Sequence, residues 1–600
     1  MGKAHLIKPL LLMMFILLQA FYPLVISDER SLKANIYDYI KREAWMTSGG
    51  TLRIPLLGEA GTLNPLLRTT SIEGLIMDCI YDTLVIITPD MKFAGRLAKD
   101  WEVDENGVNW VFHLYENVTW HDGKELTAED VAFTYNLLAE KGSMTPWAGV
   151  ATLIERAEAL DKYTVKITLK APFAAFLYKI ASNIYVLPKH IWENVPDITQ
   201  YENKNPVGSG PFVFVEHEPQ KYYKLRANEK YHLGRPLVDE ILLIIMSDPE
   251  AMLLAFSKGE IDATTWSIPY ASINSVENIP SVKLHRAVEV GAHFAFLNCQ
   301  RYPLNETLFR RALYHLINVS EVVETVFLGY AIPGALGFIP PHVVPWHNMD
   351  LPPKEEKYVF SLDKARDMLS ELGIIDVNND GWREMSNGME LKLTIYSYTG
   401  DPSLIRIAEI LVNNLRKVGV RAEHRSLELT TLLNNLITGD FDIVVILGGD
   451  IEPDILYDFI HSNGGFNFGK CSFPDLDALL EKQRFEIDVE KRKKTLWEIQ
   501  EKIAYYVPLL VIAHQEFVFA YRTDNFDGWV VGPVLRPDNY FSFMNVYNVK
   551  LVKTTPYPIA ISTTPVTSPT PHDMYLLIVI GIVLVIVIVL VLYLTRGKRR

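Results

Sequence analysis

Cysteine is scarce in this sequence, with only Cys79, Cys299 and Cys471 among 600 residues. A set this small and odd in number cannot form a disulfide framework, and its spacing matches no zinc site. One bridge between two of the three stays possible, but the pattern favours three buried thiols. Hydrophobic residues make up 49% of the chain, so the burial of a large core is not limiting.

Positive charge is also in deficit. The 58 Lys and Arg residues are outnumbered by 72 Asp and Glu residues, which gives a formal net charge of -14. No broad basic face is then available to neutralise phosphates, and this excludes nucleic acid as a partner. Aromatic residues are plentiful instead, with 29 Tyr and 11 Trp, which suits a protein that lines a sizeable pocket.

Sequence motifs of catalysis are absent. The sequence has no Gly-x-Ser-x-Gly elbow, no His-Glu-x-x-His and no cluster of histidine ligands. Residues 464–470 nearly spell a phosphate-binding loop, but Cys471 stands where a Ser or Thr would hold magnesium, and Pro474 interrupts the helix that should face the phosphates. We therefore expect neither an enzyme nor a cofactor.

One acidic turn begins like a calcium-binding loop. Asp376, Asn378 and Asp380 alternate, and Gly381 occupies the sixth position. The twelfth position, however, is Asn387 where a bidentate Glu belongs. The pattern favours a turn without metal, and a calcium site stays the alternative.

Long hydrophobic runs are confined to the two ends of the chain. Residues 1–27 read as a signal sequence, with an N-terminal membrane anchor as the alternative. Residues 574–594 carry no charge and extend about 31 Å as a helix, which matches the thickness of a bilayer's hydrocarbon core. The basic tail 595–600 follows, and such flanks stay on the cytoplasmic side. The sequence therefore predicts a single membrane span with the body outside.

A Ser/Thr/Pro-rich stalk, residues 553–573, separates the body from this predicted span. Such a composition cannot bury a core and favours extended conformations, so the stalk would hold the body away from the membrane. Asn117, Asn305 and Asn318 each begin an Asn-x-Ser/Thr triplet, a possible glycosylation acceptor on a surface-displayed body.

The stretch 95–138 carries the strongest local signals. Asn106-Gly107 is a turn former between two short strands, and the second strand alternates apolar and polar residues. Thr127 stands at an N-cap position with Asp130 three residues later, and apolar residues then follow at helical spacing. The sequence predicts two strands, a second turn and a capped helix.

The same stretch resembles the signature of a known family. The ordered string of Trp120, His121-Asp122-Gly123, the segment 126–131 and Tyr135 is similar to that of the family 5 solute-binding proteins of ABC importers. Further landmarks in the expected order extend the resemblance to about 49–545, nearly all of the body. A C-terminal stalk and span, with no lipid-attachment cysteine after the leader, resembles cell-surface binding proteins of archaea.

The resemblance implies an α/β, two-lobed class II periplasmic-binding-protein-like fold with an extra domain, followed here by the C-terminal transmembrane helix. It places the first lobe in three discontinuous segments, the extra domain between the first two of them, and the second lobe between the last two. The predicted body segments are, in order, 49–91, 92–205, 206–289, 290–514 and 515–552.

The family also suggests ligand-binding residues, which would lie between the lobes. The strongest candidate is Asp450, because an Asp near this position pairs with the ligand's α-ammonium in peptide binders. This sequence departs from their pattern around it, so a helix-capping role stays equally open. Trp266 could stack on a ligand, with a buried structural Trp as the alternative. The further candidates are Asn64, Tyr398, Thr399, Asn467 and Phe468.

The function implied by the resemblance is that of a substrate-binding receptor. It would capture oligopeptides or dipeptides between two lobes, close by hinge bending and deliver them to membrane permease subunits. An oligosaccharide receptor of the same fold is the alternative, and a surface hydrolase or sensory receptor is a more distant one. A buried carboxylate in the cleft would favour peptides, whereas stacked aromatics with neutral amides would favour sugars.

Overall fold

The computed structural model of the chain describes residues 33–38, 49–246, 248–352, 357–385, 387–530 and 550–551. The chain divides into two units, 1–552 and 553–600, and the second lies outside the described residues. The predicted leader, stalk, membrane span and basic tail therefore lie outside them as well. Within the described ranges, no helix combines the length and apolarity needed to cross a membrane.

The first sheet is assembled from distant parts of the sequence. Its strand order is β2 (Thr51–Leu56), β11 (Glu240–Ile245), β10 (Tyr222–Ala227) and β9 (Phe212–Glu218). β2 pairs with β11 in parallel, so the chain leaves this sheet after residue 56 and returns to it at residue 212.

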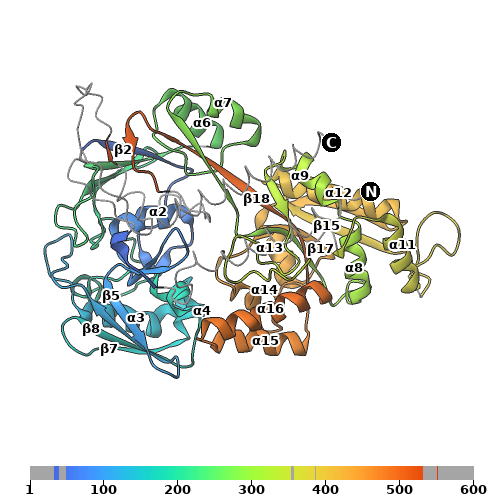
Figure 1. Cartoon of the computed structure of the whole chain (residues 1–600), viewed down its shortest axis with the longest axis horizontal. Coiled ribbons are helices and arrows are strands. Elements are labelled where there is room, and N and C mark those ends of the chain that lie inside the picture. Colours follow the sequence, from blue (N-terminus) through green and yellow to red (C-terminus); the bar gives the residue numbers. More distant parts are fainter. Residues whose placement is uncertain are drawn as a thin grey trace, which may run out of the picture. The chain divides into compact units, whose positions relative to one another are not determined.

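The segment between these visits forms a second, antiparallel sheet. Its order is β5 (Ala98–Val103), β6 (Asn109–Leu114), β8 (Thr164–Leu169) and β7 (Ile154–Ala159), with α3 (Ala128–Lys141) beside it (Figure 1). The predicted capped helix is confirmed, because the Asp130 carboxylate accepts the Thr127 N–H at 2.9 Å. The predicted turn is confirmed too, with Gly107 at a φ of 71°.

A larger sheet lies in the second half of the chain. Its order is β12 (Val282–Val288), β18 (Leu509–Arg522), β13 (Ala292–Leu297), β17 (Ile443–Gly448), β15 (Lys392–Tyr398) and β16 (Arg421–Leu427), with β14 (Ala331–Pro333) also paired to β18. All six residues of β13 are buried. Burial on both faces requires helices on both sides of the sheet.

Alternation along the central strands sends side chains into two separate cores. Ala295 and Leu297 join one core, whereas Phe294 and Phe296 join the other. Residues of α8 (Thr307–His315), α11 (Leu362–Glu371) and α12 (Pro402–Lys417) fill the first core. The second is filled from α13 (Leu429–Thr438), α14 (Ile455–Ile460), α15 (Pro474–Phe485) and α16 (Val489–Tyr506). Figure 1 shows α14, α15 and α16 grouped below β17.

The long strand β18 changes its partner part-way along. Residues 509–513 pair with β13, and residues 516–522 pair with β12. The short link 289–291 joins β12 to β13 at the same level. The change of partner in β18 and the link 289–291 thus lie side by side. They coincide with the predicted domain boundaries 514/515 and 289/290.

The remaining elements connect these sheets. A small sheet has the order β1 (Lys33–Ala34), β4 (Phe93–Gly95), β3 (Val85–Ile87). β19 (Phe526–Asp527) pairs with β20 (Lys550–Leu551). The other helices are α2 (Ser71–Ile80), α4 (Ala148–Ala151), α5 (Lys189–Trp192), α6 (Pro249–Lys258), α7 (Ile273–Glu277) and α9 (Val319–Thr325). Short helical turns are η2 (Ile36–Asp38), η3 (Pro65–Leu67), η4 (Gly142–Met144), η5 (Leu177–Ala181) and η6 (Tyr270–Ser272).

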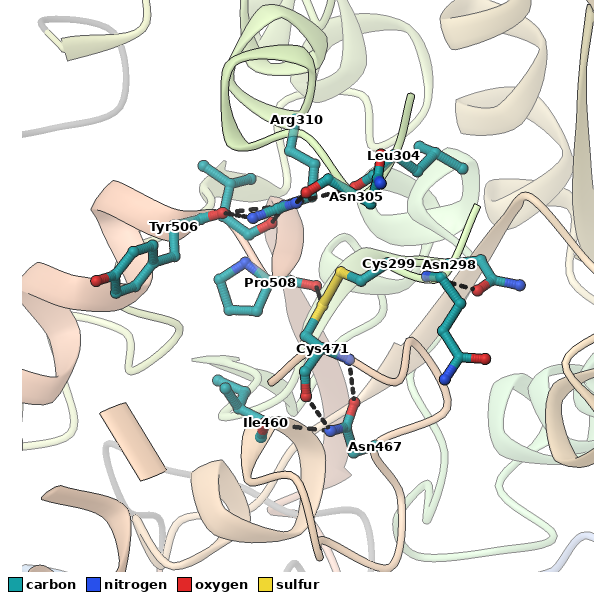
Figure 2. Close-up of a disulfide and its surroundings, with 12 residues drawn as sticks. Asn298, Cys299, Leu304, Asn305, Arg310, Ile460, Asn467, Cys471, Tyr506 and Pro508 are labelled. Atoms are coloured by element: carbon teal, nitrogen blue, oxygen red, sulfur yellow. Dashed lines mark hydrogen bonds between the residues drawn. A yellow bond between two sulfur atoms is a disulfide. The ribbon is translucent and has the colours of Figure 1, made fainter. Parts of the chain in front are cut away.

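The expectation of three buried thiols is wrong. Cys299 and Cys471 form a disulfide, and only Cys79 is a free, buried thiol (Figure 2). The two half-cystines are 172 residues apart in sequence, so no local pattern could pair them. They meet because Cys299 lies two residues after the end of β13, and the N–H of Cys299 donates to the carbonyl of Gly469 at 2.8 Å.

Candidate functional site

A cavity of about 1100 Å³ is the main candidate site. Its walls come from distant segments: the start of α2, the stretch after residue 265, the link between β12 and β13, the end of α9, the start of α12 and the end of β17. The lining residues at these places are Arg68–Ser71, Trp266–Ala271, Glu289, Gly291, Thr325–Leu328, Gly400–Ser403, Arg406, Leu447–Gly449, Gln515 and Phe517.

Aromatic side chains form one part of the wall. Trp266 is 43% exposed, which is unusual for a residue of this size and leaves its indole open to the cavity. Tyr270 stacks on Tyr330 with a ring distance of 5.1 Å, and Phe327 packs edge-on against Tyr270. The flat, apolar faces of these rings suit the carbon skeleton of an organic ligand.

Two carboxylates face the same space. Glu289 is only 9% exposed, and its Oε1 accepts the N–H of Gly291 at 3.1 Å. Asp401 is the N-cap of α12, and its Oδ1 accepts the backbone N–H of Ser403 at 2.9 Å and that of Leu404 at 3.4 Å. Buried or half-buried negative charge in a cavity favours ligands that carry a positive charge.

Arg68 provides a positive charge on another wall. Its guanidinium lies 5.3 Å from the ring centre of Trp147 and 5.5 Å from that of Tyr185. The two rings hold the planar group by cation–π contact. Among the residues that the structure describes, no carboxylate pairs with Arg68, so its charge is available to an anionic group in the cavity.

Comparison with known proteins decides the family. A model of the bacterial extracellular solute-binding proteins, family 5, matches residues 92–470, well over half of the chain. The chain belongs to the family 5 solute-binding proteins. This family is one of solute-binding receptors, in agreement with the absence of catalytic motifs from the sequence.

Relatives of this solute-binding protein extend beyond the matched segment. The oligopeptide-binding protein AppA of Bacillus subtilis is 26% identical over 490 residues, which cover 80% of this chain and 87% of that protein. The dipeptide-binding protein of Escherichia coli is 26% identical over 467 residues, which cover 73% and 84%. The structure of AppA in complex with a nonapeptide matches with a TM-score of 0.70 over 85% of this chain and 100% of that chain. The predicted α/β binding-protein fold is thereby confirmed.

Asp450 of this solute-binding protein lies next to the cavity but does not line it. Gly449 is a lining residue, whereas the Asp450 carboxylate turns toward η5. Its Oδ1 accepts the Tyr178 hydroxyl at 2.6 Å and its neighbour's N–H, that of Ile451, at 2.7 Å. In the structure, Asp450 therefore connects η5 to the loop after β17.

Two more acidic residues, at the end of this loop and within α14, also contact η5. Lys179 donates to Asp454 and Asp458, each at 3.0 Å. Burial raises the pKa of Asp454, but Lys179, Arg484 and Arg492 together outweigh this effect and lower it below the ordinary value. The carboxylates of Asp454 and Asp458 therefore form ion pairs within the fold.

Of the other predicted ligand residues, only Trp266 lines the cavity. Asn64 is buried, and its side-chain amide donates to the carbonyls of Ile198 at 2.9 Å and Tyr201 at 2.8 Å. The side-chain amide of Asn467 stabilises its own loop, because it donates to the carbonyls of Ile460 at 3.3 Å and Cys471 at 2.8 Å (Figure 2). It also donates to the carbonyl of His461 at 3.0 Å.

Phe468, Tyr398 and Thr399 are also not among the lining residues. Phe468 packs edge-on against Phe296 at 5.4 Å, within the second core of the large sheet. Tyr398 packs against both cores, and the Thr399 hydroxyl donates to Glu428 at 3.3 Å. The cavity begins one residue later, at Gly400.

The sequence interpretation missed Arg68, Glu289 and Asp401. Arg68 follows the Asn64-Pro65 turn by a few residues, and Asp401-Pro402 has the pattern of a helix start directly after a strand. This second signal was available, because side chains at the carboxyl ends of parallel strands gather at one edge of a sheet. No local signal marks Glu289.

The acidic turn forms as predicted. Its Asp376 accepts the N–H groups of Asp380 at 3.1 Å and Gly381 at 2.9 Å. Oxygens of Asp376, Asp380 and Glu384 lie within 4.8 Å of one another. The turn is stabilised by its own hydrogen bonds, and its metal-free character stays a prediction.

Proposed function

We propose that this protein is the substrate-binding receptor of an ABC importer and captures oligopeptides or dipeptides. Its family consists of solute-binding proteins, and its relatives include an oligopeptide-binding and a dipeptide-binding protein. The observation that carries the peptide assignment is a cavity of about 1100 Å³ that combines carboxylates, a guanidinium and aromatic rings. A peptide offers the matching groups: an ammonium, a carboxylate and apolar side chains.

The cavity favours peptides over oligosaccharides. A sugar site is built mainly from aromatic faces and neutral amides, and Gln515 is the one amide side chain among the lining residues. Two carboxylates face the cavity instead, and one of them, Glu289, is nearly fully buried. Charged groups of both signs on the walls, these carboxylates together with Arg68 and Arg406, suit the charged ends of a peptide better than a neutral sugar.

A thermal-shift screen of the purified full chain against peptides and oligosaccharides tests this assignment. A ligand at 100 times its Kd adds about 2.7 kcal/mol to the free energy of unfolding, which shifts the melting temperature measurably. Peptides should stabilise the protein and oligosaccharides should not. Stabilisation by sugars alone would keep the receptor role but overturn the peptide assignment.

We further propose that capture follows from hinge bending where β18 and the link 289–291 pass between the two strand pairings. This proposal is supported by the partner change along β18 next to residue 515. The first lobe would then comprise 49–91, 206–289 and 515–552, the extra domain 92–205, and the second lobe 290–514. Closure would bring the cavity walls together around the ligand and present the closed form to the permease.

Display on the outer face of the cell membrane completes the proposal. The supporting features are in the sequence alone: the leader 1–27, the stalk 553–573, the apolar stretch 574–594 and the basic tail 595–600. Full-length protein should partition with membranes and be shed by protease treatment of intact cells, whereas a chain ending at residue 573 should be secreted. Secretion of both forms would exclude the anchor.

Glycosylation at the three predicted acceptors is compatible with their positions. Asn117 and Asn305 are exposed. Asn318 is half-buried, and its side chain accepts the N–H of Glu321 at 3.3 Å as the N-cap of α9. We therefore expect sugar at Asn117 and Asn305 more readily than at Asn318, which mass spectrometry of the protein from its natural host would test.

A further inference from the structure

A second cavity, with a volume of about 280 Å³, shares no lining residue with the main one. One of its walls comes from the antiparallel sheet and from η5, through Trp101, Trp110 and Tyr178. Another wall comes from the second half of the chain, through Trp346 and Arg492. Because these walls belong to two different parts of the chain, the cavity is complete only where the two parts meet.

The size and surface of this cavity suit a small, flat organic molecule. Most of its lining side chains are apolar, and three of them are tryptophan rings. Its volume is close to the lower limit of about 300 Å³ for small-molecule sites, which gives room for a single ring system but not for a peptide chain. Aromatic walls favour an aromatic ligand, because rings pack offset or edge to face against one another.

Two buried side chains on the walls have donors without an acceptor. Trp110 is 6% exposed, and its indole N–H has no hydrogen-bond partner among the residues that the structure describes. Arg492 is 4% exposed, and its Nε and Nη2 groups donate to Gln483 and Glu452, whereas its Nη1 group donates to no described residue. Buried donors without a partner lower stability, so a ligand oxygen that accepts from both satisfies them.

The charges on the walls balance, which favours a neutral ligand. Lys33 and Arg492 supply positive charge, and Arg492 forms an ion pair with Glu452. Glu486 supplies the second negative charge. Its carboxylate accepts the N–H of Asp488 at 3.0 Å through Oε1, whereas Oε2 accepts no hydrogen bond from a described residue. A carboxamide matches this set of groups, because its oxygen accepts two hydrogen bonds and its NH₂ group donates two.

We propose that this second cavity binds a small, neutral aromatic carboxamide. The ring of the ligand packs among the tryptophan side chains, and its carbonyl oxygen accepts from Trp110 Nε1 and Arg492 Nη1. Its NH₂ group donates to the Glu486 carboxylate. Each polar atom of the ligand then has a partner, and each unpaired donor on the walls has an acceptor.

Occupancy of this cavity favours the closed protein. Beside it, the same two parts of the chain are joined by the Tyr178 hydroxyl, which donates to Asp450, and by the ion pairs of Lys179 with Asp454 and Asp458. A ligand that contacts both walls adds to these contacts and stabilises the arrangement in which the walls meet. The carboxamide and a captured peptide then raise each other's affinity. The site itself goes beyond the proposed function, whereas this effect on peptides rests on it.

Calorimetric titration of the full chain with indole-3-carboxamide tests the site without any peptide. Indole-3-carboxylate has the same shape but is an anion, and 3-methylindole lacks the carbonyl. The carboxamide should bind at one molecule per chain and at least about tenfold more tightly than either of the other two compounds. Absence of carboxamide binding, or equal binding of all three compounds, would overturn the proposal.

Two variants with matched controls locate the bound carboxamide. Trp110→Phe keeps an aromatic ring but removes the N–H, so it should weaken binding about tenfold. Trp120→Phe is its control, because Trp120 is also buried with an unpaired N–H but does not line the cavity. Ala174→Leu fills the cavity from a half-buried lining position and should abolish binding, whereas Ala139→Leu on α3 should leave it unchanged. Wild-type affinity in both Trp110→Phe and Ala174→Leu would overturn the assignment.

Peptide titrations with and without saturating indole-3-carboxamide measure the coupling between the two cavities. The carboxamide should lower the Kd of a binding peptide at least about fivefold, and the peptide should lower the Kd of the carboxamide by the same factor. Displacement of the carboxamide by the peptide would place the probe in the main cavity and overturn the second site. Unchanged affinities would refute its effect on closure. Carboxamide binding in a chain that binds no peptide would instead refute the proposed function and leave the second site standing.

Discussion

Two arginine residues of this protein differ in the partners of their guanidinium groups. Arg310 is almost fully buried, and its guanidinium donates to the carbonyls of Leu304 at 2.9 Å and Tyr506 at 2.8 Å (Figure 2). Arg68 stacks on two rings and has a charge to offer the cavity. A guanidinium surrounded by carbonyls joins elements of the fold, whereas one held by rings at a cavity wall can bind an anion.

Replacement of Arg68 by Met should affect the carboxylate end of a peptide. Met keeps much of the apolar stem but removes the charge, so binding of a peptide with a free carboxyl terminus should weaken about tenfold. The C-amidated form of the same peptide should bind the wild type and the variant alike. Calorimetry measures both, and an equal loss for the two peptides would contradict an electrostatic role for Arg68.

His514 should make the stability of the protein depend on pH. Its Nδ1 lies 2.7 Å from the carbonyl of Gly291, and its Nε2 accepts the N–H of Ala335, so the buried ring has no place for a second proton. Burial lowers the pKa of His514 to about 3. The unfolded chain, with a pKa near 6.5, then binds more protons between pH 6.5 and 3, and stability falls as the pH falls through that window.

The expected loss is about 2 kcal/mol between pH 7.5 and 5. Urea denaturation at a series of pH values measures it. His514→Gln cannot be protonated and should show a flatter profile, whereas His190→Gln, a substitution at a half-buried surface histidine paired with Asp122, serves as the control. A steep profile that persists unchanged in His514→Gln would contradict this origin.

At the scale of elements, local signals predicted much of the fold but little of the site. The turn at Asn106-Gly107 and the cap at Thr127 are decided by neighbouring residues, so the sequence alone was sufficient for them. Between Pro474 and Tyr506 the structure has two helices, α15 and α16, because Asp488 caps a new helix by accepting the Lys491 N–H. The site depends on segments brought together over hundreds of residues, which no local pattern contains.

The disulfide is another long-range contact, and it should contribute to the stability of the second half of the chain. It ties the end of β13 to the loop before α15 (Figure 2). Closing a loop of this length restricts the unfolded chain, and loss of the bridge should cost about 3 to 5 kcal/mol.

Thermal unfolding with and without a reductant measures this contribution. The reductant should lower the melting temperature of the wild type to that of the double variant Cys299→Ser/Cys471→Ser and leave the double variant unchanged. An equal effect of the reductant on both proteins would show that it acts somewhere other than at this bridge.

At the scale of the molecule, the cavity gathers charge of both signs and aromatic surface from segments on both sides of the partner change in β18. A ligand that touches Arg68, Asp401 and Trp266 would hold these segments together. Ligand binding and closure would then be one event, because the closed arrangement is favoured only by the contacts that the ligand adds. An ABC importer requires this coupling from its receptor.

The most direct test of the account follows Trp266 during a peptide titration. Trp266 lines the cavity and is 43% exposed, so a captured peptide must cover its indole. The account predicts a shift of tryptophan emission to shorter wavelength that saturates at one peptide per chain and is largely lost in Trp266→Phe, although peptides still raise the melting temperature of that variant. Peptide binding that leaves the emission of the wild type unchanged would contradict capture in this cavity.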